Sequence, residues 1–224
     1  MTVQLELTPA GLYFPDTAGI AIPTAEETAR FKLGGLIVDT EGRPLHPEFL
    51  TLLGERGARF GKGEFYRWGP NYTVDPVIIA TEYGKNGRVA DDRVLTIIRK
   101  SNGKRALPGG FVDLVDGVYE NKHSAAVREA LEETSVNIAR DRWEILYDEF
   151  VRDDRETANA WPHTTAFLFR HPEFSPAVAG DDAVPGSAEW LRFDELDMKH
   201  LHGSHARLIQ LGFEAVWASR APQV

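Results

Sequence analysis

Three glutamates and one arginine lie within six consecutive residues, Arg128-Glu129-Ala130-Leu131-Glu132-Glu133. Side chains three or four positions apart share one face of a helix, so the three glutamates would project together. Carboxylates crowded in this way repel one another unless a cation neutralises them. The segment therefore predicts either a divalent-cation site or, as the plainer alternative, an acidic helix face exposed to water.

A helix over residues 122–134 would position these carboxylates. Val127, Ala130, Leu131 and Thr134 fall on its other side and are expected to pack against a core. Carboxylate oxygens suit a hard ion, so the spacing predicts Mg²⁺ or Mn²⁺ in preference to zinc or copper. The predicted metal ligands are Glu129 and Glu133, with Glu132 as a third ligand or acting through water.

Upstream residues extend the pattern. Leu107-Pro108-Gly109-Gly110 precedes Glu120, and seven residues separate Glu120 from Arg128. This arrangement resembles the Nudix box, G-x5-E-x7-R-E-U-x-E-E-x-G-U, where U is aliphatic. Two departures matter most: nine residues, not five, lie between Gly110 and Glu120, and Ser135 replaces the last glycine. That glycine is interpreted as a helix C-terminal device, so Ser135 should affect stability more than chemistry.

The resemblance implies a Nudix-type α/β/α sandwich with a mixed sheet and a hydrolase of diphosphates that uses a metal-activated water. Arg128 is expected to orient the carboxylates by pairing with one of them, and Glu120 is a candidate partner. The glycines would let the backbone approach the metal site. The general base stays open between Glu120 and Glu132, with Asp153 and Asp154 as weaker candidates.

Four further segments resemble one Nudix branch, the ADP-ribose pyrophosphatases of the mitochondrial type, whose homologue forms the ADP-ribose-sensing domain of a melastatin-type TRP channel. These segments are residues 68–76, 153–161, 179–183 and 201–205. Taken singly, each has a structural explanation as a turn, a surface hairpin, a solvated loop or a helix cap.

The branch implies hydrolysis of ADP-ribose to AMP and ribose 5-phosphate. Arg155 would clamp a phosphate or a ribose hydroxyl with its planar fork, and Asp181 or Asp182 would accept from a ribose diol. The full set of predicted substrate-binding residues is Tyr72, Thr73, Leu107, Gly109, Gly110, Arg155, Asp181, Asp182, His202 and Ser204.

The rest of the chain predicts two domains, a small accessory domain over residues 1–74 and the catalytic domain over residues 75–224. Expected strands cover 1–7, 31–38, 77–80, 94–98, 143–151, 164–170 and 189–193. Expected helices begin at the Thr24-x-x-Glu27 capping box and cover 47–53, 122–134 and 204–219.

Composition limits the function classes. The 224 residues include no cysteine, which excludes disulfides. The formal net charge of −9 argues against a nucleic-acid partner, because binding to a phosphate backbone depends on Lys and Arg. No secretory signal or membrane span is apparent, so a cytoplasmic protein without a membrane partner is expected. Monomer and homodimer both remain open.

Three alternatives to an ADP-ribose pyrophosphatase remain. The first is a sensor that binds ADP-ribose without hydrolysing it, although an intact Arg-Glu-x-x-Glu-Glu sequence favours an enzyme. The second is a hydrolase of another nucleoside diphosphate derivative, such as NADH or a nucleotide sugar. The third is a transcriptional regulator built on a Nudix domain, against which the acidic balance and the lack of a helix-turn-helix pattern argue.

Overall fold

The computed structural model describes residues 20–56 and 59–220. The chain forms two compact units, one made of residues 1–71 and 150–163 and the other of residues 72–149 and 164–224. The segment 150–163, which the sequence analysis placed in the second domain, thus belongs to the first unit. The expected strand over residues 1–7 lies outside the described residues.

The first unit contains two short helices, α1 (Ala25–Leu33) and α2 (Phe49–Arg56). The capping box of α1 is confirmed, because the Thr24 side chain accepts from the Glu27 amide while the Glu27 carboxylate accepts from the Thr24 amide. Asn159 ties separate loops of this unit together by accepting from the Gly61 amide and donating to the Pro44 carbonyl.

The strand predicted over residues 31–38 is wrong. Helix α1 continues through Leu33 and ends at Gly34, and Gly35 follows with φ of 80°. A capping box favours helix from its first turn onward, and the positive φ at Gly35 suits glycine alone among common residues. Only Val38 forms a β-bridge in this stretch, with Pro44.

The central sheet has the strand order β3-β2-β1-β8-β7, with β4 paired to β1 and β9 paired to β2. The long strands β1 and β2 are antiparallel, with Ile79 opposite Val94. The strand bounds are β1 Gly69–Tyr83, β2 Val89–Ile98, β3 Arg105–Ala106, β4 Gly110–Phe111, β7 Arg142–Phe150, β8 Ala160–His171 and β9 Glu189–Arg192.

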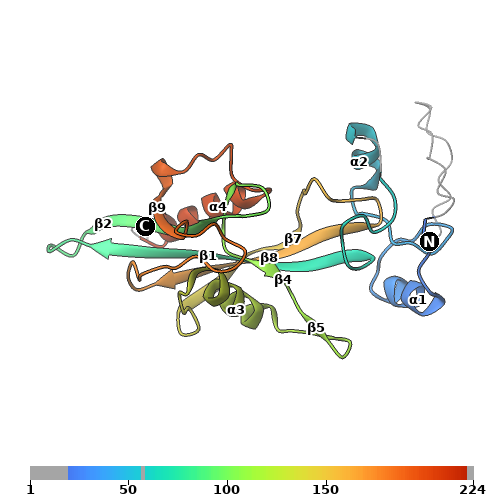
Figure 1. Cartoon of the computed structure of the whole chain (residues 1–224), viewed down its shortest axis with the longest axis horizontal. Helices are drawn as coiled ribbons and strands as arrows, with labels where there is room; N and C mark the ends of the chain where they lie inside the picture. The colour runs from blue at the N-terminus through green and yellow to red at the C-terminus, as the bar shows by residue number, and fades with distance from the viewer. Residues whose placement is uncertain (1–19, 57–58, 221–224) are drawn as a thin grey trace. The chain divides into compact units, whose positions relative to one another are not determined.

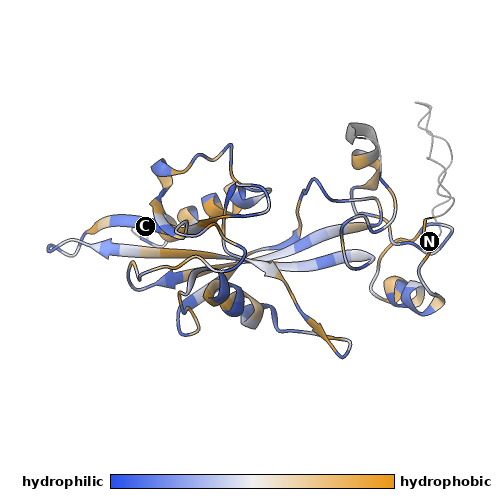
Figure 2. Ribbon diagram, viewed as in Figure 1, coloured by the Kyte–Doolittle hydropathy of each residue, from blue (hydrophilic) through white to orange (hydrophobic). Residues whose placement is uncertain are grey.

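Helices α3 (Lys122–Thr134) and α4 (His205–Ala218) cover opposite faces of this sheet within the second unit (Figure 1). Ile209, Gly212, Phe213 and Val216 of α4 are buried, as the sequence predicted. Figure 2 shows apolar colouring on parts of α4 and on the middle of the long strand β1. The predicted architecture of a mixed sheet between helices is confirmed.

The packing face of α3 differs in part from the prediction. Ala130 and Thr134 are buried, but Leu131 is 47% exposed. Ala125 and Ala126 contact the sheet in its place. Small side chains let the helix lie close to the strands, and this rotation carries Glu133 inward to 5% exposure.

Candidate active site

Arg128 holds the carboxylates of the acidic helix together. One of its terminal nitrogens, Nη1, lies 2.7 Å from Glu129 and 3.1 Å from Glu132, while Nη2 lies 2.9 Å from Glu120. Nη2 also donates to the Phe111 carbonyl, 3.2 Å away. The hydrogen bond with Glu120 is the largest of the effects that raise the pKa of Arg128. The expected pairing of Arg128 with Glu120 is therefore present.

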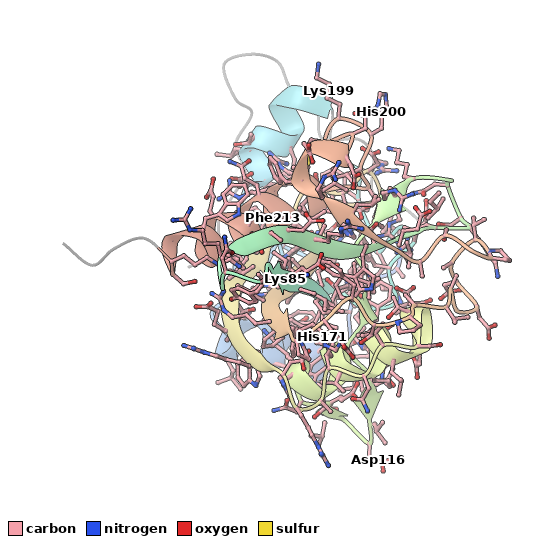
Figure 3. The ribbon with its side chains drawn as sticks, turned by 90° about the vertical axis from the view of Figure 1, so that its left-hand side faces the viewer. Lys85, Asp116, His171, Lys199, His200 and Phe213 are labelled. Atoms are coloured by element: carbon pink, nitrogen blue, oxygen red, sulfur yellow. The ribbon has the colours of Figure 1, made fainter. Side chains whose placement is uncertain are left out.

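The extra residues before Glu120 fold into a hairpin of β5 (Leu114–Val115) and β6 (Val118–Tyr119). Its two turn residues, Asp116 and Gly117, have φ of 52° and 79°, as a tight two-residue hairpin turn requires. Figure 3 shows Asp116 at the outer tip of this hairpin.

The hairpin closes where it begins, since the Glu120 amide donates to the Asp113 carbonyl at 2.8 Å. Its six residues therefore leave the main path of the chain and return to it. Glu120 reaches Arg128 in spite of the longer spacing, because the insertion projects outward and does not displace the ends of the loop.

Glu133 is fixed by the double-glycine turn. Its Oε2 accepts from the Gly109 amide at 2.8 Å. A side chain at Gly109 would overlap the Val74 carbonyl, and one at Gly110 would lie 2.7 Å from the Glu129 carboxylate. Both glycines are therefore required by close approach, with Gly110 leaving the space that the Glu129 carboxylate occupies.

Electrostatics favour a cation beside these two glutamates. Burial raises the pKa of Glu133 to about 7, and the nearby charge of Glu129 acts in the same direction. Burial also raises the pKa of Glu129, although the hydrogen bond from Arg128 opposes it. Arg128 thus compensates the carboxylates only in part, and added positive charge would stabilise their ionised forms.

The residues present fit a divalent ion held by two carboxylates. Across the described residues, no three His, Asp or Glu side chains converge as a ready-made metal cage. Mg²⁺ is commonly held by one or two carboxylates, with water and substrate phosphates completing its shell. Glu129 and Glu133 supply such a pair, whereas the Glu132 side chain is more than half exposed and contacts Arg128.

Ser135 ends α3 in the left-handed conformation, with φ of 59° and its amide donating to Leu131. The last box position is therefore a C-terminal cap, as the sequence analysis interpreted it.

A second set of buried polar residues supports the chain just before the double-glycine turn. The Leu107 amide donates to His205 Nδ1 at 2.8 Å, and His205 Nε2 lies 3.4 Å from Asp75. Thr164 donates to the same Asp75 carboxylate. The sequence predicted no role for Asp75, and for His205 only the helix cap that segment 201–205 allows. The available signal was an aspartate two residues before the apolar run 77–80.

The remaining predicted substrate residues of the second unit contact several different elements. Thr73 lies opposite Phe111 in the β1–β4 pairing. The Tyr72 ring packs edge-on against Tyr119 of the hairpin, with centroids 5.0 Å apart. His202 packs edge-on against His205 at 5.2 Å.

Ser204 and the two aspartates occupy structural positions as well. Ser204 precedes α4 as its N-cap residue without a side-chain cap bond. The backbone carbonyls of Asp181 and Asp182 accept from Lys100, through its ammonium and its amide respectively.

Arg155 belongs to the first unit. Its guanidinium forms a two-point ion pair with Asp153, at 2.9 and 2.7 Å, and lies over the Phe65 ring. The Asp153 hydrogen bond is the main cause of the raised pKa of Arg155.

Comparison with known proteins identifies the fold family. A family model described as the NUDIX domain matches residues 82–211. The chain belongs to the Nudix family. This membership and the suspected relatives of the ADP-ribose pyrophosphatase type are confirmed.

Three curated relatives match most of the chain. It is 30% identical over 205 residues to "ADP-ribose pyrophosphatase, mitochondrial" of Rattus norvegicus, covering 79% of this chain and 55% of that protein. It is 30% identical over 177 residues to "Putative nudix hydrolase 6" of Caenorhabditis elegans, covering 75% and 62%. A "Transient receptor potential cation channel subfamily M member-like 2" of Nematostella vectensis is 28% identical, covering 81% and 12%. The chain thus spans little more than half the length of the first two relatives.

Solved structures show the same Nudix fold. A MutT/nudix family protein from Enterococcus faecalis matches with a TM-score of 0.52 and 27% identity, covering 88% of this chain and 76% of that one. The NUDIX domain of Shewanella oneidensis NrtR, complexed with ADP ribose, matches with a TM-score of 0.51 and 21% identity, covering 75% and 97%. Among the described residues, no helix has the length and apolarity needed to cross a membrane.

Proposed function

We propose that this Nudix protein hydrolyses the diphosphate of ADP-ribose. In this reaction, the oxygen of a water molecule bonds to one phosphorus while the bond from that phosphorus to the bridging oxygen breaks. The bridging oxygen stays with the other phosphorus, so the products are AMP and ribose 5-phosphate, with protons released to solvent.

The observation that carries the proposal is the pairing of Glu129 and Glu133 beside the double-glycine turn. Both carboxylates are shielded from water, and their negative charge is only partly compensated by neighbouring cations. This suits a site that receives a cation together with a phosphorylated ligand. The 30% identity to the rat enzyme named as an ADP-ribose pyrophosphatase supports the choice of substrate.

Within this proposal, Glu129 and Glu133 would hold Mg²⁺ or Mn²⁺, with Glu132 close enough to contribute through water. The ion, when bound, would neutralise phosphate charge and acidify a water molecule. Arg128 orients Glu129, and the Gly109 amide orients Glu133. Glu120 and Glu132 remain the proposed candidates for the general base.

Substrate recognition is proposed for residues outside the box. Arg155 would exchange part of its pairing with Asp153 for a phosphate or ribose oxygen. Asp181 or Asp182 would accept from a ribose diol. The other proposed substrate contacts are Tyr72, Thr73, Leu107, Gly109, Gly110, His202 and Ser204.

The direct test is incubation with ADP-ribose and Mg²⁺, followed by chromatography for AMP. A panel of ADP-ribose, NADH and a nucleotide sugar at equal concentration ranks the substrates. ADP-ribose should give the highest kcat/KM and should require the added metal. A higher kcat/KM for NADH or the nucleotide sugar would replace the proposed substrate while leaving the proposed chemistry in place.

A sensor that binds ADP-ribose without cleaving it is the second candidate. The observation that favours it is the elongated loop between Gly110 and Glu120, which is four residues longer than in the family pattern. Calorimetry that shows ADP-ribose binding, combined with no AMP after prolonged incubation with Mg²⁺, would select the sensor.

The residues of the site determine neither the cellular compartment nor the oligomeric state of the protein. The cytoplasm remains the location predicted from the sequence, whereas the rat relative carries the word mitochondrial in its name. Both monomer and homodimer are compatible with the proposed chemistry.

A further inference from the structure

Arg99 lies directly after β2, where a loop joins this strand to the C-terminal end of α3. The Lys100 amide donates to the Asp182 carbonyl, and the Val184 amide donates to Ile98, so the loop follows the end of the strand. Arg99 itself forms a β-bridge with Ala183.

The same loop is attached to the acidic helix. The Gly180 amide donates to the Glu133 carbonyl at 2.9 Å, and the Val178 amide donates to Thr134 at 2.9 Å. A side chain at Gly180 would overlap the Glu132 carbonyl, so the loop and the helix are in close contact. This loop therefore brings the end of β2 next to the end of α3 that carries Glu133.

The Arg99 guanidinium lies close enough to the Glu133 carboxylate for the two opposite charges to interact. Arg99 Nε is shielded from solvent and has no hydrogen-bond partner among the described residues. Leaving a charged donor buried without an acceptor is costly, which points to an acceptor supplied by a ligand.

Other arginines near this edge are engaged. Arg105 donates to Thr96 and pairs with Glu189 at 2.7 Å. Arg93, which lies on β2, pairs with Asp91 at 2.6 Å. Arg99 thus differs from these neighbours in keeping a donor available beside the proposed metal-binding glutamate.

We propose that Arg99 binds a phosphoryl oxygen of the ligand beside Glu133. The assignment rests on the proposed diphosphate hydrolysis. It adds to the proposed site a positively charged side chain at the end of β2 that would contact the phosphates. A guanidinium is suited to this task, because its planar fork donates two parallel hydrogen bonds to a phosphate. It would also offset the charge that the phosphates bring next to the glutamates.

The test compares Arg99→Gln with Arg93→Gln, a control on β2 that lies outside the site. Two quantities are measured with Mg²⁺ present: kcat/KM for ADP-ribose, and the Kd of the product AMP by calorimetry. Charge-assisted hydrogen bonds predict a loss of roughly 10- to 100-fold in kcat/KM and at least about tenfold weaker AMP binding for Arg99→Gln. Arg93→Gln should stay within about twofold of the wild type for both quantities, since surface changes outside a site have small effects.

Arg99→Lys is the second variant and serves if Arg99→Gln does not fold. Lysine keeps the charge but has no Nε–H fork, so partial recovery of AMP affinity is expected. A folded Arg99 variant that matches the wild type in both quantities would overturn the assignment. Should the wild type bind AMP in an Arg99-dependent way yet release none from ADP-ribose, the phosphate site would stand and the proposed hydrolysis would fail. Absence of both AMP binding and AMP release in the wild type would overturn both.

Discussion

Glu133 is the residue at which stability and proposed function oppose each other. Its side chain is buried beside Glu129 and accepts one hydrogen bond from the Gly109 amide. A buried carboxylate whose pKa is raised to about 7 destabilises the metal-free fold whenever it is ionised.

Glu133→Gln should therefore stabilise the protein in a chelating buffer. Glutamine keeps an acceptor for the Gly109 amide and carries no charge. The folded carboxyl binds a proton more tightly than the unfolded one, so the unfolding free energy of the wild type falls as pH rises from about 4.5 to 7. The gain from the substitution should be greatest above pH 7, on the order of 2 kcal/mol. Urea denaturation at pH 8 and pH 4.5 measures it, and an equal gain at both pH values would contradict this explanation.

His205 is a positioning residue by its contacts, since it touches the Leu107 amide and Asp75. His205→Phe removes the acceptor and should destabilise the fold by about 1–3 kcal/mol, the typical cost of an unsatisfied buried donor. It should also lower kcat more than it raises KM, because the turn that holds Glu133 loosens.

His205→Asn is the matched variant, since its amide oxygen can replace Nδ1 as an acceptor for Leu107. It should recover most of the lost kcat, whereas the exposed His200→Asn should change nothing. Equal kcat for His205→Phe and the wild type would show that the turn holds its position without this support.

At the scale of elements, the hairpin between Asp113 and Glu120 explains why a longer loop still places the glutamate. Leu114 and Tyr119 are direct cross-strand partners, one step inside the Asp113–Glu120 hydrogen bond. Joining them directly would leave a four-residue β-turn closed by that same bond.

Deleting residues 115–118 should therefore preserve both folding and ADP-ribose turnover, with kcat/KM within about threefold, since loops tolerate such changes when the ends keep their bonds. The deletion also restores the five-residue spacing of the family pattern. Circular dichroism and AMP release measure the outcome, with Glu120→Ala as the reference for loss of the ion pair. A folded deletion variant as inactive as Glu120→Ala would show that the hairpin has a role in turnover.

The end of α3 offers an independent test of the helix. Ser135 adopts φ of 59°, a conformation that costs about 1 kcal/mol for most residues and little for glycine. Ser135→Gly should raise the unfolding free energy by roughly 0.5–1 kcal/mol and leave kcat unchanged. Thermal and urea unfolding measure the gain, and a loss of stability would exclude the cap interpretation.

Local sequence signals predicted that the charged side chains of the acidic helix gather together, because the contacts between them are local. Arg128, Glu129 and Glu132 lie within two helical turns, and a 3.6-residue period is enough to place them on one face. The exposure of Leu131 was missed, since the periodicity does not fix how far a helix is rotated when alanines form its contact with the sheet.

Contacts between distant segments could not be read from spacing. Asp75 and His205 lie 130 residues apart in the sequence and meet only through the β1 and α4 packing of the second unit. Arg99 carries no local signal either, because its proximity to Glu133 depends on the loop over residues 178–184. The strand prediction for residues 31–38 was wrong for another reason. The apolar run there suits a strand, but the capping box that precedes it starts a helix that continues into this segment.

At the scale of the whole molecule, the chain combines the unit that carries the Nudix box, residues 72–149 and 164–224, with a unit made of the N-terminal part and residues 150–163. The unit that carries the box contains the acidic helix, the double-glycine turn and Arg99. The other unit contains the ion pair of Arg155 with Asp153.

The most direct measurement is the rate of AMP formation from ADP-ribose, with and without Mg²⁺, in the wild type and in folded Glu133→Gln. Glu214→Gln, an exposed change on α4, is the control. We expect metal-dependent AMP formation in the wild type and the control, and at least about a hundredfold lower turnover in Glu133→Gln, equivalent to roughly 3 kcal/mol of barrier. Turnover of ADP-ribose by folded Glu133→Gln at a rate near that of the wild type would contradict the assignment of this glutamate as a metal ligand.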